Sequence, residues 1–210
     1  RMSHDIRTPI NGICGMIDVA DHHADDIEKQ TECRAKIKEA SHLLLELVNE
    51  VLDMSKLEAD EMVLEETPFN LSSIAKEVFA VIEQIAAEQN IRIMWEKKEV
   101  THRNLIGSPA YVKRVMMNIL SNAVKYNKEN GCIYISCREI ISEQPEMTTM
   151  EFVCRDTGIG MTDAFQKRIF EPFAQEHIGS RTKFTGTGLG MPISKKLVEK
   201  MGGTITFKSK

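Results

Sequence analysis

An apolar stripe of the coiled-coil type constrains the fold of this chain most strongly. From Ile37 to Ser55, side chains that share a helix face recur alternately four and three residues apart: Ile37, Ser41, Leu44, Val48, Val51 and Ser55. A period of about 3.5 residues is typical of left-handed helix bundles. A second helical series precedes it (Ile6, Ile10, Ile13, Cys14 and Ile17), and the acidic stretch 21–28 between the two predicts a turn. We expect the two helices to form a hairpin. Because their apolar stripes are wider than one partner helix can cover, we expect two chains to form a four-helix bundle.

From about residue 68 onward the pattern changes to helices mixed with strands. Helices are predicted at Leu71–Glu88, around 112–123, at 164–169 and at Pro192–Met201. Strands are predicted within 61–68, at Asn90–Glu96, at Cys132–Ile141, at Met150–Arg155 and in a last segment ending at Lys210. This order predicts an α/β sandwich with helices on one face of the sheet. The expected fold class is therefore α+β, with a helical hairpin at 1–60 and a second domain at 68–210.

Composition excludes several classes of protein. The net charge is −4 with acids and bases interspersed, which does not indicate a nucleic-acid surface. The five cysteines are odd in number and form no C-x-x-C pair, so a reducing cytoplasm is the expected location. No apolar run approaches the ~20 residues that span a bilayer. Because residue 1 falls inside a predicted helix, we interpret the chain as a fragment, whose membrane contact would come only through an upstream segment.

The segment S-H-D-I-R-T-P (Ser3–Pro9) has the features of a phospho-acceptor helix. His4 and Thr8 lie about 40° apart on one helix face, away from the apolar series. Asp5 can accept the Nδ1 proton of His4, which leaves Nε2 with a lone pair for nucleophilic attack. Pro9 lacks an N–H and predicts a bend just after His4. On these residues alone, an equal alternative is that His4 is a solvated surface histidine and Asp5 is a charge near the N-terminus of its helix.

A second polar group predicts a site for metal and phosphate. Asn118, Asn122 and Lys125 fall within about 60° of one another on the predicted helix around 112–123. Amide oxygens suit Mg²⁺, and a lysine neutralises phosphate charge. By themselves these three residues are more typical of a solvated polar face.

Two glycine-rich segments complete the candidate site. D-T-G-I-G (Asp156–Gly160) follows a predicted strand, where a carboxylate can bind an adenine amino group and glycines allow close approach of the base. G-T-G-L-G (Gly186–Gly190) opens a helix, whose amides can cradle phosphate. Each motif is weak alone, and the second is not a Walker loop because it lacks G-K-[ST]. Their order and spacing together indicate a nucleotide site.

The motifs resemble those of sensor histidine kinases. Ser3–Pro9 is similar to the H-box of that family, and Asn118–Tyr126 is similar to its N-box. Asp156–Gly160 and Gly186–Gly190 look like its two glycine boxes, and F-E-P-F (Phe170–Phe173) looks like the phenylalanine box between them. All five occur in family order and span essentially the whole chain.

The resemblance implies a dimerisation and phosphotransfer hairpin, followed by an ATP-binding domain of the Bergerat type shared with Hsp90 and gyrase. By this similarity His4 is the phospho-acceptor, Asp5 its base, and Thr8 the residue that orients water in members that also dephosphorylate their response regulator. Asn118 would hold Mg²⁺. The remaining implied ATP-binding residues are Asn122, Lys125, Tyr126, Asp156, Gly158, Gly160, Gly186, Thr187, Gly188, Leu189 and Gly190.

The segment before Gly186 departs from the family pattern. It reads S-R-T-K-F-T, so either Arg181 or Lys183 could contact the γ-phosphate. The sequence also ends at Lys210, before the final strand of such domains, which indicates a C-terminally truncated domain.

The function implied is ATP-dependent autophosphorylation of His4 and transfer to an aspartate of a response-regulator receiver domain, by a homodimer, with Met54–Glu66 as the hinge between domains. One alternative is an ATPase of the Hsp90, gyrase or mismatch-repair kind, which needs no phospho-acceptor helix. Another is a degenerate kinase that acts as a dimeric scaffold. Retention of His4, Asn118 and Asp156 argues against the scaffold.

Overall fold

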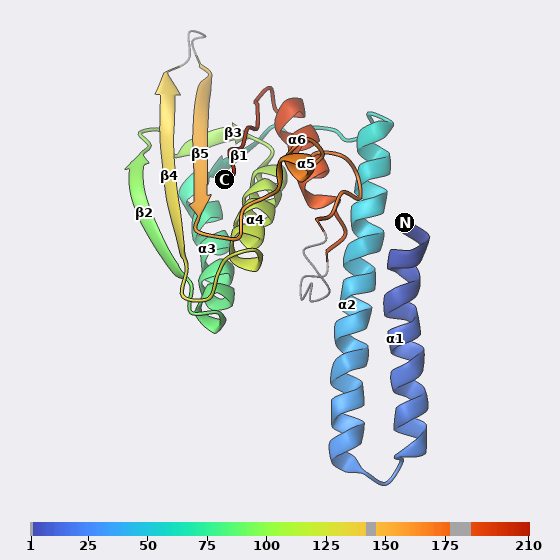
Figure 1. Cartoon of the computed structure of the whole chain (residues 1–210). Helices are drawn as coiled ribbons and strands as arrows, with labels where there is room; N and C mark the ends of the chain where they lie inside the picture. Colours follow the sequence, from blue (N-terminus) through green and yellow to red (C-terminus); the bar gives the residue numbers. More distant parts are fainter. Residues whose placement is uncertain (1, 142–145, 177–185) are drawn as a thin grey trace.

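The N-terminal region of the computed structural model is an antiparallel helical hairpin (Figure 1). The structure describes residues 2–141, 146–176 and 186–210, except for the side chains of 2–5 and 141. Helix α1 spans Met2–His22 and helix α2 spans Ile27–Glu58. The turn is shorter than the predicted 21–28, because the Asp26 side chain caps α2 by accepting a hydrogen bond from the Lys29 amide at 2.9 Å.

The hairpin buries part of its apolar surface and leaves part exposed. On α2 the buried residues are Cys33, Leu47 and Met54, which lie outside the predicted stripe. Large apolar side chains of both helices stay exposed within this chain: Ile10, Ile17, Leu45, Val48 and Leu52. Within the predicted stripe, Ile37, Leu44 and Val51 are half-buried and Val48 is exposed.

The second domain is built on a three-stranded mixed sheet in the order β2-β4-β5. Strand β2 (Arg92–Glu99) runs parallel to β4 (Cys132–Ile141), and β4 runs antiparallel to β5 (Thr148–Asp156). Two short strands, β1 (Thr67–Asn70) and β3 (Asn104–Gly107), form a separate antiparallel pair. The sequence pattern did not predict β3. Residues 204–210, where a strand was predicted, form no sheet ladder and are held by side-chain contacts, such as Phe207 against Phe170.

Helices α3 (Leu71–Glu88) and α4 (Pro109–Lys125) pack against the sheet, as the pattern predicted. The core includes Val78 and Ile82 of α3, Leu120 of α4 and the alternating Ile133 and Ile135 of β4, all fully buried. These contacts confirm the α+β class with a helix layer on a mixed sheet. No helix in the described ranges is long and apolar enough to cross a membrane.

A second apolar cluster joins the hairpin to the second domain. Helix α6 (Gly190–Lys200) follows the short helix α5 (Asp163–Gln166) and lies beside α2 in Figure 1. The cluster contains Met54 of α2, Val115 of α4, and Leu189, Ile193 and Leu197 at and within α6. Two ion pairs border it: Asp53 with Arg114, and Asp60 with Lys200 at 2.6 Å.

This cluster also corrects the predicted hinge, Met54–Glu66. Helix α2 continues to Glu58, and Met54 is buried against the second domain. A segment held by helical hydrogen bonds and packing cannot bend easily. Of the predicted hinge, only the residues between α2 and β1 lie outside regular structure, and their role as a hinge stays a prediction.

Candidate active site

The Asn118 side chain lies where α4 meets the start of α6. Its Nδ2 donates to Ser194 Oγ at 2.7 Å, and its Oδ1 accepts from Asn122 Nδ2 at 3.3 Å. A Cβ built on Gly190 would lie only 2.2 Å from Asn118 Oδ1, far inside van der Waals contact. The predicted shared face of Asn118 and Asn122 therefore exists, and Gly190 is what allows α6 to begin against it.

Lys125 and Tyr126, at the end of α4, reach the same segment. The Lys125 Nζ lies 5.0 Å from the centre of the Tyr126 ring. A Cβ on Gly186 would lie 2.5 Å from Lys125 Nζ and 3.8 Å from the Tyr126 hydroxyl. The N-box and the second glycine box, which are distant in sequence, are thus brought together by the packing of α4 and the segment that leads into α6.

The G-T-G-L-G segment presents an open helix N-terminus. Leu189, the N-cap residue of α6, makes no side-chain capping hydrogen bond. In the first turn the Gly190 and Met191 amides could donate to an anion, whereas Pro192 has no N–H. Gly188 has φ +71°, and a Cβ there would lie 2.7 Å from the Ala174 carbonyl oxygen, so this position requires glycine. The Leu189 side chain is fully buried in the interdomain cluster. The Leu189 side chain therefore packs in the core, and its predicted contact with ATP stays a prediction.

The D-T-G-I-G loop closes against the end of α4. Asp156 Oδ1 accepts from the Gly158 amide at 2.8 Å, and the Ile159 amide donates to the Tyr126 carbonyl at 3.1 Å. A Cβ on Gly158 would lie 2.4 Å from that carbonyl oxygen, and one on Gly160 (φ +69°) would lie 2.2 Å from the Lys210 carbonyl oxygen. The loop is therefore pinned on both sides, while the Asp156 side chain stays exposed.

Two residues that the sequence analysis missed hold this loop. Asn127 is buried, and its Oδ1 accepts from Thr157 Oγ1 at 3.1 Å while its Nδ2 donates to the Cys132 carbonyl at 3.2 Å. Thr157 Oγ1 in turn accepts from the Cys132 amide at 2.9 Å. Asn127 directly follows the N-box and Thr157 lies within the first glycine box, so adjacency to the motifs was the available signal.

Glu50 of α2 was also missed, and it lies beside the second glycine box. Its carboxyl group lies near the Thr187 side chain. Its Oε2 is buried and has no hydrogen-bond partner among the described residues. Burial raises the pKa of the Glu50 carboxyl. The polar Thr187 side chain opposes this shift, and the Glu46 charge adds to it.

Several predicted residues are not placed. Arg181 and Lys183 lie outside the described residues, as do the side chains of His4 and Asp5, although both of these belong to α1. Thr8 is exposed on α1. The roles of these five residues remain predictions from the sequence.

The described residues fit Mg·ATP. The uncapped start of α6 and the Lys125 ammonium could supply positive charge for phosphates, and Asn118 could supply an amide oxygen for Mg²⁺.

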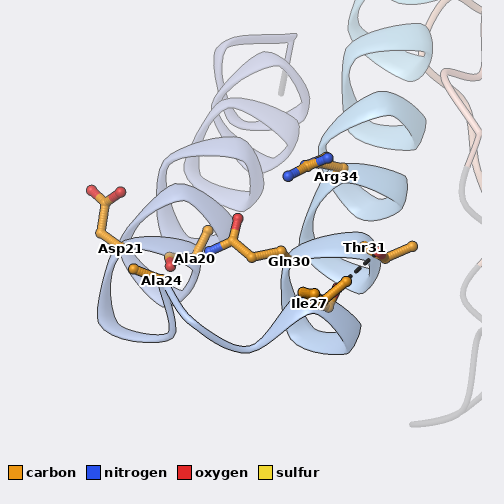
Figure 2. A pocket seen from close by; sticks show the side chains of 7 residues that line it. All are labelled: Ala20, Asp21, Ala24, Ile27, Gln30, Thr31 and Arg34. Atoms are coloured by element: carbon orange, nitrogen blue, oxygen red, sulfur yellow. Dashed lines mark hydrogen bonds between the residues drawn. The ribbon is translucent and has the colours of Figure 1, made fainter.

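The hollows of the structure lie elsewhere. One of about 390 Å³ at the hairpin turn is lined by residues such as Ala20 and Gln30, whose side chains Figure 2 shows. A second hollow beside β2 is lined by residues such as His102 and Glu139. The glycine boxes line neither of these two hollows, so neither hollow coincides with the predicted nucleotide-binding residues.

Comparison with known proteins gives two family matches. The His Kinase A (phospho-acceptor) domain matches residues 1–60. The histidine kinase-, DNA gyrase B- and HSP90-like ATPase family matches residues 107–210.

Curated relatives match over nearly the whole chain. The sensor histidine kinase GacS of Pseudomonas protegens is 32% identical over 99% of this chain and 22% of its own length. BarA, a signal transduction histidine-protein kinase of Escherichia coli, is 34% identical over the same shares of the two proteins. This chain thus spans about a fifth of the length of these relatives.

Solved structures share the fold. AdeS, a histidine kinase of Acinetobacter baumannii, superposes with a TM-score of 0.71 at 19% identity, covering 99% of this chain and 91% of its own. Full-length ShkA in complex with AMPPNP superposes with a TM-score of 0.68 at 28% identity, covering 95% of this chain and 40% of its own. ThkA in complex with the response regulator TrrA superposes with a TM-score of 0.68 at 27% identity, covering 96% of this chain and 53% of its own. With its phospho-acceptor domain, its ATPase domain and an N-box that packs against both glycine boxes, the chain belongs to the sensor histidine kinases.

Proposed function

We propose that this chain transfers the γ-phosphate of Mg·ATP to His4 and then passes the phosphoryl group to an aspartate of a response-regulator receiver domain. The observation that carries the proposal is the convergence of Asn118 and Lys125 on the glycines at the start of α6. The matched ATPase domain implies ATP binding, which supports it further.

Each residue has a distinct part in the proposed transfer. Nε2 of His4 forms the new N–P bond as the bond from the γ-phosphorus to the leaving ADP oxygen breaks, while Asp5 holds the Nδ1 proton. Lys125 and the amides of α6 stabilise the charge of the phosphates. Asn118 would hold Mg²⁺, which would neutralise phosphate charge when bound. Catalysis then rests on positioning and charge neutralisation rather than on covalent help from the protein.

We propose further that the chain acts as a homodimer. The large apolar side chains exposed on α1 and α2, among them Leu45, Val48 and Leu52, follow helical spacing on the hairpin surface. A second hairpin would bury them and complete a four-helix bundle.

Sedimentation equilibrium tests the homodimer. Leu45→Glu would place a charge in the proposed interface and should convert dimer to monomer, because an unpaired charge is costly to bury. Persistence of the dimer in this variant would contradict the proposed face.

The receiver-domain partner and a reverse, phosphatase activity belong to the same proposal. ThkA, with the same fold, is seen in complex with a response regulator. Thr8 stands one helical turn after His4 and is exposed, so it could orient water toward a phosphorylated aspartate of the partner. Thr8→Ala should reduce dephosphorylation of the receiver while autophosphorylation continues.

The decisive experiment is incubation with γ-labelled Mg·ATP. Native protein, His4→Ala and Asn118→Ala are compared, and the label is tested for acid lability, which distinguishes phosphohistidine from phosphoserine. Acid-labile label on the native protein alone is the expected result. Absence of label on native protein that still binds ATP would contradict the kinase proposal and favour a scaffold.

A further inference from the structure

Ser194 is a buried polar residue in an otherwise apolar part of α6. Its exposed fraction is 1%, and its neighbours Ile193 and Leu197 belong to the interdomain cluster. Burying a hydroxyl is unfavourable unless a hydrogen bond compensates for the lost water. Ser194 meets this need through Asn118, whose Nδ2 donates to its Oγ at 2.7 Å.

The contacts of Asn118 fix which end of its amide faces α6. On the Ser194 side the neighbouring Met191 Sδ, at 3.7 Å from Asn118 Nδ2, can only accept a hydrogen bond. On the other side Asn122 donates to Asn118 Oδ1. The Met191 contact therefore places the nitrogen on the Ser194 side, and the Asn122 hydrogen bond agrees with an oxygen that faces away from Ser194. In this orientation Oδ1 lies against Gly190, at the uncapped start of α6.

Only the oxygen of a carboxamide can bind a cation, so this orientation decides whether Asn118 is a metal ligand. We infer that Ser194 is a positioning residue, which holds the Asn118 amide with its oxygen toward the Mg²⁺ of bound Mg·ATP. The inference rests on the proposed function, since it requires Asn118 to bind the metal. Ser194 itself touches neither metal nor nucleotide.

Removing the hydroxyl should weaken metal binding selectively. In Ser194→Ala the Asn118 nitrogen loses its strongest acceptor, and the amide is free to rotate. Loss of a group that orients a metal ligand typically costs about 10–100-fold in metal affinity. Nucleotide binding without metal depends on Asp156, Lys125 and the glycines, and should stay within about twofold, because these groups act on the phosphates and the base directly.

The test measures binding rather than turnover. The Kd of AMPPNP is measured with Mg²⁺ and with EDTA, and Mn²⁺ binding to the AMPPNP complex is followed by electron paramagnetic resonance. Ser194→Ala is expected to weaken Mn²⁺ binding about tenfold and to remove most of the effect of Mg²⁺ on the AMPPNP Kd. Ser194→Cys, of similar size but a weak acceptor, should fall between native protein and Ser194→Ala, and remains informative if the alanine variant unfolds.

Ser108→Ala is the matched control. Ser108 is also buried, and its hydroxyl donates to the Glu65 carbonyl at 2.7 Å, away from Asn118. Its loss should lower stability without changing the effect of metal. Equal weakening of AMPPNP binding with and without Mg²⁺ in Ser194→Ala would assign Ser194 a purely structural role and overturn the inference.

The same data separate this inference from the proposed function. If Mg²⁺ strengthens binding to native protein and Asn118→Ala abolishes that effect, but Ser194→Ala preserves it, the positioning role alone is wrong. If Mg²⁺ has no effect on native protein, both the metal role of Asn118 and the inference fail together.

Discussion

The guanidinium of Arg114 on α4 forms an ion pair with the carboxylate of Asp53 on α2, and this contact ties the ATPase domain to the phospho-acceptor hairpin. Both side chains are partly buried, with exposed fractions of 31% and 23%. The pair borders the apolar cluster of Met54, Leu189 and Ile193. The second glycine box and the hairpin are thus packed together through α6 in this arrangement.

Charge reversal at Asp53 should loosen this arrangement. In Asp53→Arg, two like charges would face each other in a partly buried interface, which should destabilise docking by about 1–2 kcal/mol. Faster amide hydrogen exchange in the second half of α2 would report the change. The double variant Asp53→Arg with Arg114→Asp restores the pair and should recover native exchange; continued fast exchange would show that the ion pair is not responsible.

Truncation of Met54 should have a larger effect on the same interface. Met54 is 8% exposed and packs against residues of α4 and α6. Met54→Ala should therefore destabilise the chain by about 2 kcal/mol or more. Chemical denaturation measures the change. Lys56→Ala, at an exposed position two residues on, is the control and should lie within about 0.5 kcal/mol of native protein.

Neutralising Glu50 should stabilise the docked arrangement at neutral pH. Burial raises the folded-state pKa of this carboxyl above its ordinary value of 4.5. The Glu50 carboxyl therefore makes its full contribution to stability at pH values below its pKa in the unfolded chain. This contribution is lost as the pH rises through its raised pKa in the folded chain. Glu50→Gln should gain about 1 kcal/mol at pH 7, a modest value because solvent still screens part of the group.

The pH profile provides the check on Glu50. Thermal unfolding of Glu50→Gln and native protein should differ at pH 7 and converge as the pH falls toward about 4, where the native carboxyl is protonated. Glu58→Gln, an exposed carboxylate on the same helix, should show no such convergence. A constant difference at all pH values would contradict the raised pKa.

A methyl group at Gly190 should damage the nucleotide site. Because its Cβ would lie 2.2 Å from Asn118 Oδ1, Gly190→Ala must displace either the Asn118 side chain or the start of α6. We expect AMPPNP binding in the presence of Mg²⁺ to weaken by about tenfold or more, as when a metal ligand loses its orientation. Gly12→Ala, where no atom lies within 4 Å of the new Cβ, should instead stabilise α1 by about 0.5–1 kcal/mol without affecting AMPPNP binding.

Local patterns were sufficient for several elements and for the arrangement of the N-box. Helix α3 and strand β4 have the predicted bounds, because helical periodicity, the Asn70 cap and strand alternation are properties of neighbouring residues. Asn118 and Asn122 share a face because residues four apart on a helix are neighbours. In contrast, β3 is only four residues long and depends on pairing with β1, which no local pattern specifies.

The sequence by itself determined the α+β class and supplied the residues of the proposed nucleotide site, because periodicity and motif spacing are local properties of the chain. Only the tertiary structure decided that Ser194 accepts from Asn118, and that Glu50 and Met54 of the hairpin lie against the second glycine box and α6. Those contacts join residues distant in sequence. They depend on how whole helix surfaces pack and on which buried polar groups find partners, a balance of free energies that no short segment encodes.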